Sequence, residues 1–166
     1  MSASPRGSSS ALILGGAGFL GSHTVGGLAA SGWRVTVIDG ELPGCGGDKE
    51  LLTKVRGNAE LIECNVEEVD DLGERLADCD VVIDAMGWTR HREGLANPLR
   101  DMDLNLACHL HVISKLPRKN PPRVIYLGSR GQYGQPDSAM IDEDTPMVPR
   151  DPQGVHKVAA ESHFRV

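Results

Sequence analysis

The sequence lacks an excess of basic residues: its 17 lysines and arginines are outnumbered by 23 aspartates and glutamates, which gives a formal net charge of −6. This balance excludes a broad cationic surface for nucleic-acid phosphates or anionic lipids, and we expect neither partner. A small anionic ligand held locally by backbone amides is still compatible with it.

Long hydrophobic runs are also missing. No apolar stretch approaches the length of a membrane span, and the opening residues, MSASPRGSSS, lack the apolar centre of a signal peptide. We therefore expect no membrane association, and we interpret residues 1–10 as a disordered leader.

The four cysteines, at positions 45, 64, 79 and 108, have neither the close spacing of a metal or redox site nor the density of a small disulfide-bonded protein. We expect reduced thiols, no metal site and a cytoplasmic location.

The remaining sequence, residues 11–166, fits one globular domain in which short β-rich apolar runs alternate with longer helical patterns. Strands that alternate with helices pair in parallel through right-handed crossovers, so the pattern predicts a doubly wound α/β sheet, the Rossmann fold. The predicted strands are 11–15, 33–39, 59–66, 80–87 and 123–129, and the predicted helices are 19–32, 48–56, 67–79, 97–117 and 153–166.

The helix over 97–117 has a clear start signal, with Asn97 as the N-cap and Pro98 in the first turn. Apolar residues then recur at helical spacing and predict the buried stripe of this helix. They are Leu99, Met102, Leu106, Leu110 and Ile113.

The first strand-to-helix turn, GGAGFLG, carries the sharpest signal. Its Gly15, Gly18 and Gly21 follow a G-x-x-G-x-x-G pattern between a predicted strand and a predicted helix. Glycines there allow a tight turn, a close approach of the backbone to a pyrophosphate and close packing of the helix, whose N-terminus favours negative charge. The pattern predicts a dinucleotide site.

Asp39 closes the second predicted strand, where a carboxylate can accept hydrogen bonds from both hydroxyls of an adenosine ribose. The same carboxylate would repel a 2′-phosphate, and no basic residue directly follows it. We therefore expect NAD rather than NADP, with an ordinary strand-end aspartate in a turn as the alternative.

Several further motifs accompany the glycine loop: ECNV, DVVIDAMG, VIYLGSRGQYG and the segment IDEDTPMVPRDPQGVHKVAAE. Together with LILGGAGFLGSHTVGGLAASGWRVTVID they resemble the extended short-chain dehydrogenases/reductases, in the NAD-dependent epimerase/dehydratase branch that acts on nucleotide sugars. The resemblance covers residues 11–166 and implies NAD as cofactor. It also implies a cofactor site made by Gly15, Gly18, Phe19, Leu20, Gly21, Asp39, Asn65, Val66, Ala85, Met86, Gly87, Asn105 and Lys157.

The resemblance places Ser129 at the family's catalytic serine and Lys157 at its catalytic lysine. The family has a tyrosine four residues before the lysine, on the same helix face, and this tyrosine takes up a proton while hydride passes between sugar and cofactor. Here the position is Gln153. A neutral amide can orient a substrate but cannot act as a base, so we expect impaired or altered catalysis.

Two explanations for Gln153 stay open. Either the protein keeps the cofactor site and has lost or altered the reaction, or another group supplies the base, for which Tyr133 and His156 are the nearby candidates. The segment WTRHRE after the fourth strand adds Arg90, His91 and Arg92 as groups that could meet a diphosphate, with a solvated loop as the alternative.

The family builds its substrate-binding lobe largely from segments after the tyrosine and lysine helix. This sequence ends at Val166, within the predicted counterpart of that helix, so we expect a Rossmann domain truncated before the lobe. The resemblance also implies a homodimer through helices 97–117 and 153–166. The predicted function is an NAD-binding domain that serves transient hydride transfer on a nucleotide sugar, or alternatively a catalytically silent NAD-binding module.

Overall fold

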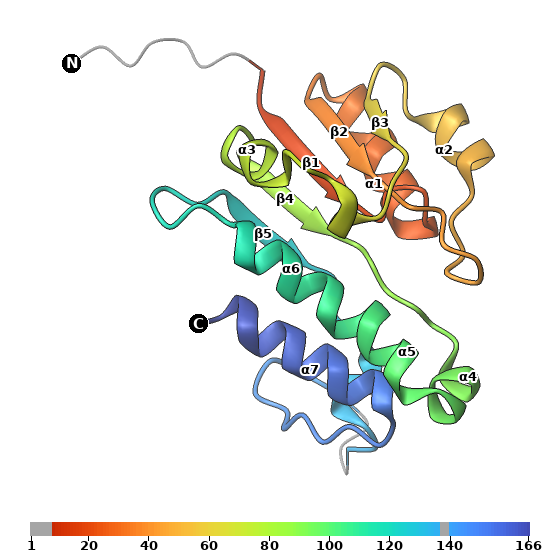
Figure 1. Ribbon diagram of the computed structural model, residues 1–166. Coiled ribbons are helices and arrows are strands. Elements are labelled where there is room, and N and C mark those ends of the chain that lie inside the picture. Colours follow the sequence, from red (N-terminus) through yellow and green to blue (C-terminus); the bar gives the residue numbers. More distant parts are fainter. Residues whose placement is uncertain (1–7, 137–139) are drawn as a thin grey trace.

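The computed structural model describes residues 8–136 and 140–166. Five strands form one sheet in the order β3-β2-β1-β4-β5, and every neighbouring pair is parallel (Figure 1). This confirms the predicted doubly wound α/β fold. The strands are β1 (Ser10–Leu14), β2 (Arg34–Ile38), β3 (Glu60–Ile62), β4 (Val81–Asp84) and β5 (Arg123–Tyr126).

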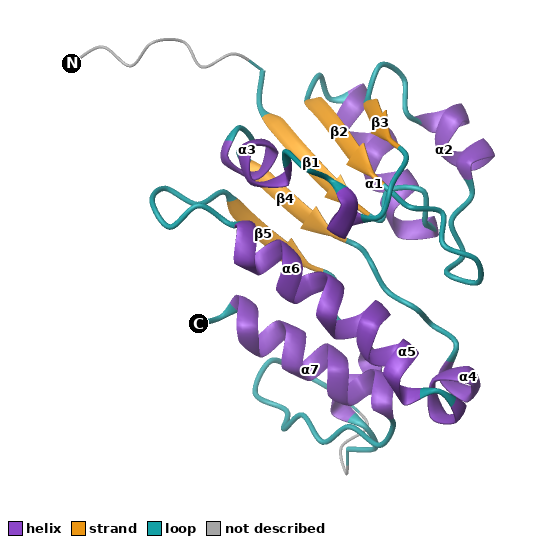
Figure 2. Cartoon of the chain, in the orientation of Figure 1, coloured by secondary structure: helices purple, strands orange, loops and turns teal. Residues whose placement is uncertain are grey.

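Helices cover both faces of the sheet (Figure 2). The main ones are α1 (Phe19–Ala30), α2 (Lys49–Val55), α3 (Leu72–Ala77), α4 (His91–Ala96), α5 (Pro98–Met102), α6 (Cys108–Lys115) and α7 (Pro152–Phe164). A π-helical turn, η2 (Asp103–Ala107), joins α5 to α6, and 3-10 turns occur at η1 (Val66–Glu68) and η3 (Arg130–Tyr133).

Two hydrophobic clusters lie on opposite faces of the sheet, because successive side chains of a strand point to opposite sides. Leu12 and Leu14 pack with Leu72, Val112 and other residues of η1, α3 and α6. Ile13 lies in the other cluster, which includes residues of α1 and α2. All five residues of β1 are buried, as expected for a central parallel strand covered on both faces.

Some predicted boundaries shift. β3 ends at Ile62, so Asn65 and Val66 lie in the following loop and 3-10 turn rather than in a strand. The segment WTRHRE, for which a solvated loop is the alternative prediction, is helical from His91 onward, in the short helix α4. Of the predicted leader, residues 1–7 lie outside the described residues, whereas Ser10 belongs to β1.

The start of the long helical segment is confirmed, since Asn97 Oδ1 accepts a hydrogen bond from Arg100 N at 3.2 Å and Pro98 is in the first turn. Its predicted buried stripe is wrong at Leu99 and Met102, whereas Leu106, Leu110 and Ile113 are half-buried. Leu99 is 70% exposed and Met102 is 37% exposed. The fully buried residues of this segment are Asp101, Asn105, His109 and Val112, so three of the four are polar.

No helix in the described part of the chain has both the length and the apolar character that a bilayer span requires. Within the same residues no cluster of metal-ligating side chains is found, and all four cysteines are free.

Candidate cofactor and active site

The β1–α1 turn is built so tightly that it accepts only glycine at two positions. Gly15 has φ +74°, and a Cβ on it would lie 2.9 Å from Met86 N at the end of β4. A Cβ on Gly21 would overlap the carbonyl oxygen of Gly15. Both contacts involve backbone atoms, which cannot move aside as a flexible side chain could. The turn therefore brings α1 against the carboxyl ends of β1 and β4.

The N-terminus of α1 opens beside this turn. Gly18 is its N-cap, no side chain caps the helix, and no acidic residue lies in the first turn. First-turn amides without a side-chain cap, together with the helix dipole, favour an anion at this point. Phe19 and Leu20, which belong to the predicted cofactor site, are 71% and 60% exposed.

Asp39 lies at the end of β2 in the same pocket as Gly15 and Gly18. Its Oδ2 accepts a hydrogen bond from Ala17 N and its Oδ1 one from Glu41 N, each at 2.8 Å. Each carboxylate oxygen can accept more than one hydrogen bond, so both retain acceptor capacity toward the pocket. The two backbone amides fix the orientation of the carboxylate.

Asn65 and Val66 also line this pocket. The side-chain oxygen of Asn65 is buried and has no hydrogen-bond partner. A Cβ on Gly40 would overlap that oxygen, so the glycine is required for the asparagine to lie where it does. A buried amide oxygen without a partner costs free energy unless a donor reaches it.

Ala85, Met86 and Gly87 continue from β4 along the pocket. The Met86 carbonyl oxygen accepts a hydrogen bond from Lys157 Nζ at 2.9 Å. A Cβ on Gly87 would lie 3.1 Å from the same Nζ. The structure thus brings Lys157, on α7, to the segment that follows β4.

Asn105 is fully buried in the π-helical turn and binds both backbone groups of Trp88. Its Oδ1 accepts from Trp88 N at 2.9 Å, and its Nδ2 donates to Trp88 O at 3.1 Å. Gln153 Nε2 donates to the same Trp88 oxygen. In this structure the two side chains hold the segment after β4, and both amides are engaged within the protein.

Lys157 is 6% exposed and lies at one end of a chain of buried polar groups. Its Nζ is 3.5 Å from His109 Nε2, and His109 Nδ1 is 2.7 Å from Asp84 Oδ2. Burial lowers the pKa of Lys157, and the Asp84 carboxylate acts in the opposite direction. The Lys157 ammonium also lies 4.9 Å from the ring centroid of Tyr126.

Asp84 and His109 are not among the site residues that the sequence predicts. A signal was present: Asp84 interrupts the apolar run VVIDAM, and His109 follows Asn105 and Asp101 at four-residue steps on the helix. Polar residues at four-residue steps share one helix face, and such a row together with a polar residue in an apolar strand indicates a buried polar cluster.

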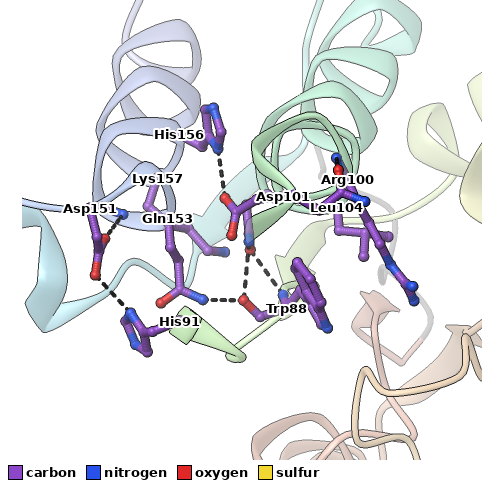
Figure 3. Close-up of polar contacts among 12 residues, drawn as sticks. Trp88, His91, Arg100, Asp101, Leu104, Asp151, Gln153, His156 and Lys157 are labelled. Carbon is purple, nitrogen blue, oxygen red and sulfur yellow. Dashed lines mark hydrogen bonds and ion pairs between the residues drawn. The ribbon is translucent and has the colours of Figure 1, made fainter. Parts of the chain in front are cut away.

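Ser129 lies in a second pocket, lined also by His91, Arg130, Arg150 and Asp151 among others. Its Oγ accepts a hydrogen bond from Gly131 N at 3.1 Å, and Ser129 thereby caps the turn η3. Asp151 caps α7 by accepting from Gly154 N at 2.7 Å and also pairs with His91 Nδ1 at 2.8 Å (Figure 3).

Of the residues that the sequence offers as an alternative base or as diphosphate contacts, His156 and Arg90 bind partners within the protein and Tyr133 lies half-buried. His156 Nδ1 is 2.6 Å from Oδ1 of the fully buried Asp101, so this histidine links α7 to α5 by a hydrogen bond. Arg90 contacts Glu93 at 2.8 Å and the Gly44 carbonyl oxygen at 3.0 Å. Tyr133 is half-buried at the end of η3.

Comparison with known proteins gives one consistent result. The family model described as "NAD dependent epimerase/dehydratase family" matches residues 11–165. The chain is 29% identical to UDP-glucose 4-epimerase 3 of Oryza sativa subsp. japonica over 94% of this chain and 44% of the relative. It is 30% identical to the UDP-glucose 4-epimerase of Azospirillum brasilense over 98% of this chain and 44% of the relative. The chain spans about half the length of the curated relatives it matches.

Solved structures show the same likeness. The UDP-glucose 4-epimerase of Bifidobacterium longum, in complex with NAD+ and UDP, superposes with a TM-score of 0.83 at 26% identity, covering 95% of this chain and 48% of that one. An NAD-dependent NDP-hexosamine 5,6-dehydratase involved in tunicamycin biosynthesis superposes with a TM-score of 0.79 at 29% identity, covering 93% and 48% of the two chains.

Proposed function

The chain belongs to the NAD-dependent epimerase/dehydratase family, and from this premise we propose that it binds NAD at the carboxyl ends of its parallel strands and serves a reaction on a nucleotide sugar. The observation that carries the proposal is the glycine cradle of the β1–α1 turn, which leaves no room for a Cβ at Gly15 or Gly21. Such close backbone approach beside an uncapped helix N-terminus suits a pyrophosphate.

Other residues of the pocket fit the rest of a dinucleotide. Asp39 would accept hydrogen bonds from the adenosine ribose, and none of the residues lining the pocket is basic, which favours NAD over NADP. The unpartnered Oδ1 of Asn65 would accept from a donor on the adenine, with Val66 beside the ring. Ala85, Met86 and Gly87 would flank the cofactor, and Lys157 would bind the nicotinamide ribose.

NAD, when bound, supplies a hydride acceptor for the oxidation of a sugar hydroxyl. The chain's own part is to position the reactants and to handle the proton of that hydroxyl. Ser129 would donate or accept a hydrogen bond at the sugar, from the second pocket. Gln153 cannot take the proton, and its amide donates to Trp88 O, so catalysis through the position of the usual tyrosine is impaired.

A second candidate function follows from the same contact. Since Gln153 and Asn105 both serve to hold the Trp88 segment, the helix face that carries chemistry in the family here has a structural task. A catalytically silent NAD-binding module, with a regulatory or structural role, would need only the glycine cradle and Asp39. We further propose a cytoplasmic location, in keeping with four free thiols, and a homodimer through the helical segments 97–117 and 153–166.

Calorimetric titration with NAD and, in parallel, NADP tests the cofactor proposal. We expect micromolar binding of NAD, weaker binding of NADP, and about tenfold or greater loss of NAD affinity in Asp39→Ala, because charge-assisted hydrogen bonds to the ribose disappear. Asp144→Ala, which removes an exposed loop carboxylate, is the matched control. If neither nucleotide binds to the folded wild-type chain, the NAD site is disproved.

A further inference from the structure

Three titratable residues from three elements form a continuous buried chain: Asp84 at the end of β4, His109 on α6 and Lys157 on α7. Asp84 and His109 are completely buried, and Lys157 is 6% exposed. His109 Nδ1 is 2.7 Å from Asp84 Oδ2, and His109 Nε2 is 3.5 Å from Lys157 Nζ. Each histidine nitrogen therefore faces a different charged partner.

The positions of the protons follow from this geometry. The Nδ1 nitrogen must donate to the Asp84 carboxylate, which has no proton to give when ionised. The Nε2 nitrogen can then either accept a hydrogen bond from the Lys157 ammonium or, in the imidazolium form, donate to a neutral Lys157 amine. The two arrangements differ only by one proton moved between Nε2 and Nζ, and the net charge of the buried group is zero in both.

We propose that Asp84, His109 and Lys157 share one mobile proton, which makes the neutral amine of Lys157 accessible within the buried site. Burying a charge is costly unless it is paired, and here the pairing survives the proton movement because Asp84 balances whichever nitrogen base is protonated. Without His109, Lys157 would have to release its proton to water to become neutral. The buried Asp84 carboxylate would then have no compensating charge.

The surroundings favour such sharing. Tyr126, on β5, lies edge-on to the His109 ring with centroids 5.1 Å apart, and Lys157 Nζ faces the Tyr126 ring at 4.9 Å. Burial lowers the pKa of Lys157, which favours its neutral amine. The other charged or titratable groups that act on these residues are Cys108 on α6, Glu161 on α7, and Asp101 on α5, whose carboxylate pairs with His156.

The proton chain ends at the cofactor pocket, because Lys157 Nζ donates to Met86 O and lies beside Gly87. If the proposed function holds, a neutral Lys157 could take the proton of a substrate hydroxyl. The O–H bond would break, an N–H bond would form at Nζ, and the alkoxide charge would balance the new ammonium. Lys157 would thereby supply the base that Gln153 cannot.

Nuclear magnetic resonance on the ligand-free chain tests proton sharing without any cofactor or sugar. The 15N shifts of both His109 ring nitrogens and the 13Cε shift of Lys157 are followed with pH. We expect His109 Nε2 to show a shift between its protonated and unprotonated values, and the two residues to titrate with a common midpoint. Exposed His163 and Lys54 are the controls and should titrate separately. A His109 that stays in the neutral Nδ1–H form while Lys157 titrates alone would overturn the proposal.

Two variants test whether Asp84 and His109 control the protonation of Lys157. Asp84→Asn removes the balancing charge, so His109 should lose its imidazolium population and the pKa of Lys157 should fall further. His109→Gln should leave Lys157 with a simple, independent titration. Should both variants fail to fold, the wild-type titration still decides the question. Because no NAD is present, absence of NAD binding would disprove the proposed function and leave this outcome unaffected.

Discussion

Gln153 and Asn105 donate their side-chain amides to one acceptor, the carbonyl oxygen of Trp88, from two different helical segments. Asn105 also accepts from Trp88 N, so the segment after β4 is held from both sides. The indole of Trp88 is buried at 1% exposure, and the Arg100 guanidinium lies 5.1 Å from its ring centroid. Gln153, at the position where the resemblance implies a tyrosine, is therefore part of the packing around Trp88.

The first prediction concerns Gln153→Tyr, studied with NAD and UDP-glucose as probes. The substitution removes the hydrogen bond to Trp88 O, which should cost about 1 kcal/mol of stability. It also restores a phenol four residues before Lys157. If the rest of the machinery is intact, sugar-dependent NAD reduction should rise by about 10²-fold or more.

The control for this experiment is Gln153→Phe, which has the same ring without the hydroxyl. A gain in both variants would show that the phenol is not the cause. No gain in a folded, NAD-binding Gln153→Tyr protein would favour the silent module over the enzyme.

The second prediction concerns Gly21. In Gly21→Ala the added methyl group would overlap the Gly15 carbonyl oxygen, so α1 must move away from the turn. We expect a loss of several kcal/mol, on the order of an overpacked core position, measured by urea unfolding. Gly27→Ala in the same helix has nothing within 4 Å of the new Cβ and should gain about 0.5–1 kcal/mol. Equal stability of the two variants would contradict the cradle geometry.

Much of the fold could be predicted, because it rests on local patterns. The apolar run ALIL predicts a buried parallel strand, the glycines predict the tight turn, and Asn97 with Pro98 predicts a helix start; each is confirmed by the structure. These features are fixed by residues adjacent in sequence, and their physical causes act over a few residues.

The buried face of the long helical segment could not be predicted in the same way. Apolar spacing placed Leu99 and Met102 inside, whereas Asp101, Asn105 and His109 occupy the interior. Each of these polar residues is buried because a partner from elsewhere reaches it: His156, Trp88 and Asp84 respectively. Such partners lie far apart in the sequence, so hydrophobic periodicity favours the wrong face wherever a site is built from polar groups.

The third prediction concerns Asp151 at the start of α7. Burial acts to raise the pKa of this carboxyl, but the Gly154 amide and His91 outweigh it, and the pKa is lowered overall. A carboxyl with a depressed folded-state pKa contributes stability above its unfolded pKa of about 3.9 and loses that contribution as pH falls through the folded value. Asp151→Ala should cost about 1 kcal/mol at neutral pH and progressively less in acid.

Urea unfolding at a series of pH values checks this prediction. Asp144→Ala, an exposed loop carboxylate, should have little effect at any pH. An Asp151→Ala cost that stays constant down to strongly acidic pH would show that the carboxylate charge is not what stabilises the helix start.

The fourth prediction concerns the proposed dimer. Leu99 on α5 and Val155 on α7 are 70% and 49% exposed, and α5 and α7 lie side by side (Figure 1). Exposed apolar side chains on adjacent helices mark an association surface. Sedimentation should show a wild-type dimer that Leu99→Glu converts to a monomer, while Leu42→Glu, on a loop near β2, should leave it intact. A wild-type monomer at all concentrations would reject the interface.

The last prediction uses the cysteines as reporters of the cofactor pocket. Cys45 and Cys64 line this pocket together with Gly15 and Asp39, whereas Cys79 is not among the residues that line it. Burial raises the pKa of all three thiols, that of Cys79 to about 11, so alkylation should be slow and best followed at alkaline pH. Saturating NAD should reduce the alkylation rates of Cys45 and Cys64 by roughly tenfold or more, since a bound ligand blocks access in proportion to occupancy. Cys79 should react at the same rate with and without NAD. Mass spectrometry of the labelled peptides separates the three sites, and uniform protection, or protection of Cys79 alone, would place the nucleotide elsewhere on the molecule.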